Sequence, residues 1–189
     1  MMRNRLTLLL IVMLMVGGSL LCGSGVWIHA KALLAQVLLR QAWEQTLTQG
    51  LAVKPWPWAD TWPVARLRAP KYEQDLIVLA GQAGATLAFG PGMLANSAGP
   101  GKPGTCILAG HRDTSFSFLQ QVQPGDFFVL EDGNGKQWKY RVSSTSVRPA
   151  EDLYLEHLPI SRLALVTCYP FDAVLPGTPQ RYVVIAERI

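Results

Sequence analysis

The chain from Val64 onward consists of short apolar runs separated by turn residues, and this pattern leaves few folds open to it. Eight runs are rich in β-branched and aromatic residues and have the length of strands. The predicted strands are Val64–Arg68, Asp75–Ala80, Thr86–Phe89, Thr105–Ala109, Phe127–Glu131, Lys136–Val147, Leu163–Thr167 and Arg181–Glu187. The predicted short helices are Ser115–Gln121 and Asp152–Leu158. Eight strands in roughly 125 residues predict one all-β domain, built as a closed or nearly closed barrel.

A hairpin is predicted at Asp132-Gly133-Asn134-Gly135, because Gly and Asn adopt positive φ angles at little cost. After this turn, Trp138, Tyr140 and Val142 alternate with polar residues. Alternation with a period of two predicts a strand with one buried face and one solvent-exposed face.

The N-terminal part of the chain has a different character. The 23 residues from Leu6 to Ile28 carry no charge. At about 1.5 Å per residue, a helix of that length covers roughly 34 Å, enough to cross the apolar core of a bilayer. Arg3 and Arg5 precede it, so the positive-inside rule places the N-terminus in the cytoplasm. Residues 1–28 are therefore predicted to form a cytoplasmic tip and a single-pass signal-anchor transmembrane helix in the inner (cytoplasmic) membrane, with the following domain on the periplasmic, extracytoplasmic side.

Two alternatives to an anchor are a cleaved signal peptide and a lipoprotein signal. The stretch is long for a signal peptide, and no clean Ala-x-Ala site follows it. Leu21, directly before Cys22, is too bulky for the usual lipoprotein cleavage pattern. We therefore favour a retained anchor, with Cys22 as a small apolar residue within the helix.

Residues 29–62 are predicted to form a juxtamembrane helix and a linker. Apolar residues recur at helical spacing after the anchor, and the helix is predicted to end near Gly50. The segment Lys54–Pro63 contains three Pro and three Trp. The prolines stop a helix, and the tryptophans are suited either to the membrane headgroup level or to packing on the next domain. The barrel is predicted to cover residues 63–189.

Charge and cysteine content exclude two classes of protein. Residues 1–70 contain seven Lys/Arg and two Asp/Glu, a net charge of +5, whereas residues 71–189 contain ten and eleven, a net charge of −1. The predicted barrel is almost neutral and lacks the basic surface that nucleic-acid binding needs. Three cysteines are too few for a disulfide framework. The sequence does not exclude a single disulfide between Cys106 and Cys168 in an oxidising compartment.

Three reactive types of side chain stand at the ends of predicted strands. Cys168 follows the run Leu163–Thr167, and Arg181 opens the next run. If these runs are neighbouring antiparallel strands, Cys168 and Arg181 lie together at one sheet edge. His111 follows the run that ends near Ala109. An imidazole can activate a thiol, and a guanidinium can stabilise the oxyanion that forms when the thiol attacks a carbonyl. The pattern predicts covalent acyl transfer with these three residues as the catalytic groups.

Simpler structural roles for the same residues are also open. A Cys at a strand end is often a small buried apolar residue, and an Arg that opens an edge strand is often solvated. His111 can cap the short helix that follows it. No Cys-x-x-Cys or His-x-x-x-His spacing of a zinc site occurs, and we interpret His29 and His157 as structural. No metal ion is predicted.

Taken together, these residues resemble those of a sortase, over roughly Trp62 to Ile189. The similarity is carried, in order, by Leu108-Ala109-Gly110-His111-Arg112-Asp113, Phe118-Leu119, Pro124-Gly125-Asp126, Ala164-Leu165-Val166-Thr167-Cys168 and Arg181-Tyr182-Val183-Val184. Ala164 departs from the Thr-Leu-x-Thr-Cys signature of sortases, a change that we expect to affect packing more than chemistry. The Trp- and Pro-rich entry segment is similar to that of the sortase class of Gram-negative bacteria.

The resemblance implies an eight-stranded sortase-like β-barrel and a membrane-anchored cysteine transpeptidase. It implies Cys168 as the nucleophile, His111 as the general acid/base, and Arg181 as the residue that binds substrate and stabilises the oxyanion. Thr167, which precedes the nucleophile in the signature, is assigned to substrate binding. The implied substrate is a secreted protein with a C-terminal Leu-Pro-x-Thr-Gly-like (LPXTG-like) sorting signal, cleaved through a thioacyl intermediate that an amine of unknown identity resolves. This chemistry needs no cofactor.

Three other functions remain open. A thiol hydrolase would use the same three residues, with water resolving the acyl intermediate. A membrane-anchored thiol–disulfide protein would use Cys106 and Cys168, although the Cys-x-x-Cys motif is missing. A non-catalytic periplasmic β-barrel binding module would use none of them. The sequence Leu175-Pro176-Gly177-Thr178-Pro179 itself resembles a sorting signal, and we interpret it as the loop that joins the Cys168 and Arg181 strands.

Overall fold

The computed structural model describes residues 2–151, 159–175 and 177–189, and it divides the chain into two compact units that meet between Val37 and Leu38. One continuous helix, α1 (Met2–Gln49), begins in the first unit and ends in the second. In the described part of the chain, no helix combines the length and the apolar composition that a membrane span requires. The transmembrane anchor stays a prediction from the sequence.

The end of α1 belongs to the same compact unit as the strands. Leu39 and Trp43 of α1 form a small buried cluster with Ile77 and Leu79. The helix ends at Gln49, near Gly50 as predicted, and a φ of +68° at Gly50 turns the chain away. Residues 38–62, which the sequence assigns to the juxtamembrane helix and linker, thus lie in the unit that contains the barrel.

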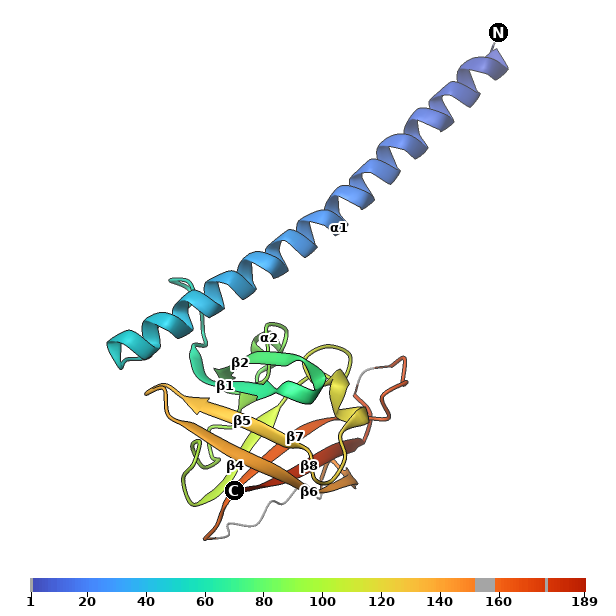
Figure 1. Ribbon diagram of the computed structural model, residues 1–189. Helices are drawn as coiled ribbons and strands as arrows, with labels where there is room; N and C mark the ends of the chain where they lie inside the picture. The colour runs from blue at the N-terminus through green and yellow to red at the C-terminus, as the bar shows by residue number, and fades with distance from the viewer. Residues whose placement is uncertain (1, 152–158, 176) are drawn as a thin grey trace. The chain divides into compact units, whose positions relative to one another are not determined.

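The second unit is built around a closed barrel, shown in Figure 1. Its strands are β1 (Pro63–Ala69), β2 (Gln74–Ala80), β3 (Gly92–Met93), β4 (Gly104–Ala109), β5 (Phe127–Asp132), β6 (Gln137–Pro149), β7 (Ser161–Tyr169) and β8 (Gln180–Arg188). They follow one another around the barrel in the order β1-β2-β3-β4-β7-β8-β6-β5. Within the described connections lie the short helices η1 (Pro70–Tyr72), α2 (Gly84–Leu87) and η2 (Ser117–Gln121). The predicted eight-stranded barrel with few helices is confirmed.

One predicted strand is wrong. Residues 86–89 lie in α2 and the turn after it, whereas the two-residue strand β3 lies just beyond, at residues 92–93. A short apolar run cannot be assigned to helix or strand from its periodicity alone. Here Phe89 packs against the Leu39 and Trp43 cluster instead of entering the sheet. The predicted helix Asp152–Leu158 lies outside the described residues, whereas the one predicted at Ser115–Gln121 is seen as η2.

The hairpin between β5 and β6 forms at the predicted turn. The Gly135 amide donates to the carbonyl oxygen of Asp132 at 2.9 Å, and Gly135 has a φ of +76°. Beyond the turn, Trp138, Tyr140 and Val142 are buried and the residues between them are exposed. These side chains enter the barrel interior together with the fully buried rings of Phe116 and Phe128.

The parallel pair β4–β7 decides which residues meet at the rim of the barrel. Residues 163–167 of β7 are all buried, since the strand lies between β4 and β8. Its register with β4 runs from Gly104 opposite Ser161 to Ala109 opposite Val166. Because parallel strands point the same way, the ends of β4 and β7 emerge at one edge of the sheet. Strand β8 runs the opposite way and therefore starts at that same edge, beside β7 in Figure 1.

Candidate active site

Cys168 and Arg181 are directly opposed across β7 and β8. The antiparallel register pairs Thr167 with Tyr182 and Cys168 with Arg181. Directly opposed residues on antiparallel strands project from the same face, with their Cβ atoms about 5 Å apart. Both side chains are partly exposed, so they reach the rim surface. The pairing expected from the sequence is confirmed by this register.

His111 reaches the same rim through an extension of the β4–β7 pairing. The Gly110 amide donates to the Val166 carbonyl oxygen at 3.1 Å, one residue beyond the last strand residue of β4. Continued by one more residue, this register brings His111 level with Cys168, and His111 is exposed there. Among the described side chains, no hydrogen bond joins the Cys168 thiol to the His111 imidazole. Catalytic hydrogen bonds are often long before a substrate binds, so this geometry is compatible with a joint role.

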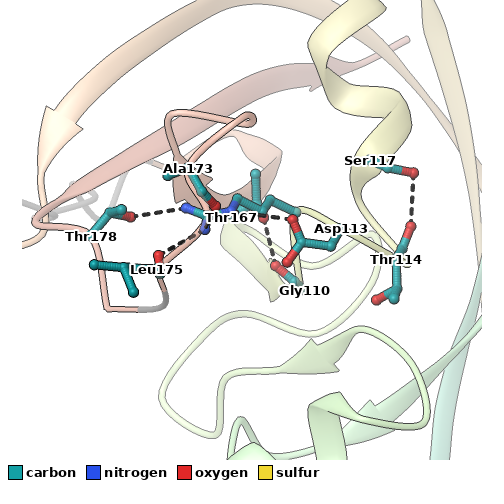
Figure 2. A network of polar contacts seen from close by, with 9 residues as sticks. Gly110, Asp113, Thr114, Ser117, Thr167, Ala173, Leu175 and Thr178 are labelled. Atoms are coloured by element: carbon teal, nitrogen blue, oxygen red, sulfur yellow. Dashed lines mark hydrogen bonds and ion pairs between the residues drawn. The ribbon is translucent and has the colours of Figure 1, made fainter.

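Thr167, predicted from the sequence to bind substrate, is buried in the structure. Its side chain is only 2% exposed. Its hydroxyl donates to the Gly110 carbonyl oxygen at 2.7 Å, as Figure 2 shows. Thr167 thus ties the residue before Cys168 to the residue before His111. The hydrogen bond of its side chain holds two strand ends together.

The second cysteine of the barrel lies far from the rim. Cys106 is opposite Leu163 in the β4–β7 register, five residues before Cys168. At about 3.3 Å per residue this separates the two cysteines by roughly 16 Å along the sheet. A disulfide needs Cα atoms within about 7 Å, so Cys106 and Cys168 cannot pair in this fold. Cys106 is also buried, and burial raises the pKa of its thiol to about 12. The thiol–disulfide hypothesis is therefore wrong.

Aromatic rings pack together next to the strand ends that carry Cys168 and Arg181. Tyr169 stacks on Tyr182 with ring centroids 6.2 Å apart, and Phe171 meets Tyr182 edge-on at 5.2 Å. Phe171 and Tyr182 pack against the barrel core. Because Tyr169 follows Cys168 and Tyr182 follows Arg181, this aromatic group fixes the two strand ends from the side.

A cleft of about 580 Å³ adjoins the rim. Its lining comes from the residues that directly follow His111, from the residues that directly follow Cys168, and from η2. The lining residues are Arg112, Asp113, Ser117, Gln120, Tyr169, Pro170, Phe171 and Asp172. This cleft is large enough for a short peptide segment or a substituted amine. Over the described residues, no group of three or more His, Cys, Asp or Glu side chains is arranged to hold a metal ion.

Arg112 is a site residue that the sequence reasoning does not single out. It is 6% exposed, although it directly follows the exposed His111. Its guanidinium donates to the carbonyl oxygens of Ala173 and Leu175 and to the Thr178 hydroxyl, all between β7 and β8 (Figure 2). The sequence contains one signal for it, an arginine placed directly after the candidate histidine at a predicted strand end. Burial is what separates it from an ordinary surface arginine, and burial is a property of the fold.

The fold and this rim can be compared with known proteins. The family model of the sortase domain matches residues 67–189. The chain belongs to the sortase family. Sortase D of Bacillus subtilis (strain 168) is 31% identical over 126 residues, which cover 65% of this chain and 62% of that relative. The match thus spans less than two thirds of the relative's length.

Solved sortases share the barrel. Sortase A from Corynebacterium diphtheriae is similar with a TM-score of 0.61 and 28% identity, covering 70% of this chain and 63% of that one. A Sortase D5 transpeptidase from Clostridium perfringens has a TM-score of 0.66 at 19% identity, covering 82% of this chain and 98% of that one. At that low identity the second likeness concerns the fold alone. The sortase resemblance of the sequence is therefore confirmed at the level of family and fold.

Proposed function

We propose that this sortase-family chain is a membrane-anchored cysteine transpeptidase that cleaves a C-terminal LPXTG-like sorting signal of a secreted protein and transfers the product to an amine. The observations that carry the proposal are the register that opposes Cys168 and Arg181 and the Gly110–Val166 hydrogen bond, which extends the β4–β7 pairing toward His111. Family membership supports the class of reaction. The similarity to the Gram-negative sortase class stays a prediction from the sequence.

In the first half-reaction, the Cys168 thiol loses its proton to His111 and its sulfur attacks the carbonyl carbon of the scissile amide. The C–S bond forms, and the negative charge moves to the carbonyl oxygen, which Arg181 stabilises. The C–N bond then breaks, and the leaving amine takes the proton from the His111 imidazolium. The product is a thioester on Cys168.

In the second half-reaction, an amine attacks the thioester carbonyl and gives up a proton to His111. The C–S bond breaks, the sulfur leaves as a thiolate, and a new amide bond forms. The transfer conserves the acyl group and consumes neither an oxidant nor a reductant. His111 acts as a base and as an acid in turn, as general acid–base catalysis requires.

Arg181 has donors left for the oxyanion. The hydrogen bonds described for its guanidinium use only Nη1, which donates to the carbonyl oxygens of Thr178 and Gln180 at 2.6 and 2.9 Å. A guanidinium carries five N–H donors in a rigid fork. Anchoring through one nitrogen therefore orients the remaining N–H groups instead of exhausting them.

The deciding experiment is intact-mass spectrometry of the protein after incubation with candidate sorting peptides. We expect a mass increase equal to the acyl fragment, located on Cys168. Cys168→Ala is expected to lose the adduct and turnover while staying folded, and Cys106→Ala to keep most activity because it lies outside the rim. An inactive but folded Cys106→Ala variant with an unacylated Cys168 would refute the assignment.

The same assay separates the alternatives. Product analysis with and without an added amine distinguishes transpeptidation from hydrolysis, since a hydrolase releases the same free acid in both cases. A protein that binds the peptide without forming an adduct would support a binding module.

Membrane attachment is part of the proposal and rests on the 23 uncharged residues between Arg5 and His29. The full-length protein is expected to stay in the membrane fraction after extraction with alkaline carbonate. Replacing both Met13 and Val16 by Arg should release it, because each charge near a bilayer centre costs about 2.5–3.5 kcal/mol. A wild-type protein that carbonate removes completely would refute the anchor.

A further inference from the structure

The proposed reaction gives no role to Arg112, a buried charged residue that directly follows His111. The Arg112 side chain is 5% exposed. A guanidinium stays protonated in proteins, and a charge removed from water must be compensated by partners. The identity of those partners shows what Arg112 does.

Most of the groups that compensate the buried charge of Arg112 belong to the loop between β7 and β8, residues 170–179. Nη2 of Arg112 donates to the carbonyl oxygens of Ala173 and Leu175 at 2.5 and 3.0 Å. Nη1 approaches the Thr178 hydroxyl at 3.4 Å. The carboxylate of Asp113, 3.3 Å from Nε, is 69% exposed and so is a weak partner. In Figure 2 the groups of Ala173, Leu175 and Thr178 converge on one point from three sides.

Among its described residues, the β7–β8 loop has few other anchors. The side chains of Val174 and Leu175 are 95% and 75% exposed, so apolar packing does not hold its tip. Of the backbone hydrogen bonds described for this loop, one is a long contact of 3.4 Å between the Ala173 amide and the Pro170 carbonyl oxygen. Another joins the Ala150 amide to the Pro179 carbonyl oxygen at 2.8 Å, at the far end. Arg112 is therefore the main tie of the loop tip to the barrel.

Thr178 connects Arg112 to the catalytic arginine. Its hydroxyl faces Arg112, and its carbonyl oxygen accepts a hydrogen bond of 2.6 Å from Arg181. The loop thus begins just after Cys168, is held from the residue after His111, and supplies the carbonyl that orients Arg181. One buried guanidinium links the three segments that carry the reaction.

We propose that Arg112 is a positioning residue, which holds the β7–β8 loop against the end of β4 so that Thr178 orients the Arg181 guanidinium. The inference rests on the proposed function and extends it to a residue that does not touch the substrate. Three acceptors spread over residues 173–178 match a planar fork with several donors, whereas a lysine ammonium cannot reach all of them from one point.

The test compares full-length wild type with Arg112→Met and Arg112→Lys. The readouts are the rate of Cys168 acylation by a sorting peptide and amide hydrogen exchange of residues 170–180. Losing a hydrogen bond to a charged group typically costs enough to slow a dependent step about tenfold or more. We expect Arg112→Met to lose at least about tenfold in kcat and in kcat/KM together, because only the transition-state contact of Arg181 is disturbed. The loop amides of Arg112→Met should exchange faster than those of wild type. Arg112→Lys should have an acylation rate and a loop exchange rate between those of wild type and Arg112→Met.

The matched control is Arg162→Met. Arg162 is a partly buried arginine paired with Glu187 at 3.1 Å, at the opposite end of β7. Its substitution removes a partly buried guanidinium and its ion pair with Glu187 without touching the loop, so acylation and loop exchange should stay at the wild-type level. An equal rate loss in both variants would mean that the effect is general destabilisation, and it would overturn the proposal.

Folded Arg112→Met with wild-type acylation, or with unchanged loop exchange, would also overturn it. If Arg112→Met does not fold, Thr178→Val decides the matter, because it removes the hydroxyl contact and keeps the carbonyl that Arg181 uses. That variant should acylate a few-fold more slowly with faster loop exchange, and wild-type values for both would refute the inference. A wild-type protein that never acylates would instead contradict the proposed function, and the loop exchange would still report whether Arg112 holds the loop.

Discussion

Replacing Thr167 by Val isolates a single buried hydrogen bond at the base of the active site. Val has nearly the shape of Thr, and Thr167 is 2% exposed, so the substitution opens no cavity. What it removes is the hydroxyl that donates to the Gly110 carbonyl oxygen at 2.7 Å. Leaving a buried carbonyl without this partner costs about 1–3 kcal/mol. For a unit of this size, about 2 kcal/mol lowers Tm by roughly 4–8 °C.

Catalysis should fall by more than stability alone explains. Gly110 directly precedes His111, and its carbonyl is held by the residue that directly precedes Cys168. Without this bond the two strand ends are joined less tightly, through the Gly110 amide and the Val166 carbonyl oxygen, so acylation should slow even at temperatures where the variant is fully folded. Chemical denaturation with urea gives the free energy of unfolding, and single-turnover acylation of Cys168 gives the rate.

Thr167→Ser is the control, since it keeps the hydroxyl and loses only a methyl group. It should lose some stability through the small cavity and keep most of the acylation rate. If Thr167→Val unfolds with a free energy within about 0.5 kcal/mol of wild type and acylates normally, the hydrogen bond does not organise the site and the reasoning is refuted.

Three further predictions use the same assays. Arg181→Lys should lose most of the acylation rate, because a point ammonium cannot be anchored on Thr178 and still present a fork to the oxyanion, and near-normal turnover would remove Arg181 from the mechanism. Burial raises the pKa of Cys106 from 9.0 to about 12, so the folded state is favoured while the thiol is neutral and that stability is lost as pH rises from about 9 toward 12. The unfolding free energy of wild type should therefore fall more steeply over this range than that of Cys106→Ala, by up to about 1.4 kcal/mol per pH unit, and parallel curves would contradict the buried thiol. Gly110→Ala should destabilise the fold by about 1–3 kcal/mol, since its Cβ would lie 2.8 Å from the buried Phe116 ring, and an unchanged Tm would show that the ring can move aside.

The sequence predicts local features best where few residues decide them. The Asp132–Gly135 hairpin forms because turn residues act over four positions, and the buried faces of β6 follow directly from alternation. The opposition of Cys168 and Arg181 is also local in this sense. Two consecutive strands joined by one loop pair antiparallel, so the end of one must meet the start of the other. The wrong strand at residues 86–89 arose where tertiary packing of Phe89 decided the outcome.

What the sequence by itself determined is the all-β architecture, the sortase family and the pairing of the nucleophile candidate with an arginine. The tertiary structure decided that β4 pairs in parallel with β7 across more than fifty residues of intervening chain, which brings His111 to the rim. It also decided that Thr167 and Arg112 turn inward, one to join two strand ends and the other to hold the β7–β8 loop. The burial of single polar side chains such as Thr167 and Arg112, and the pairing of distant strands, depend on the free energy of the whole fold, and no local pattern of residues encodes them.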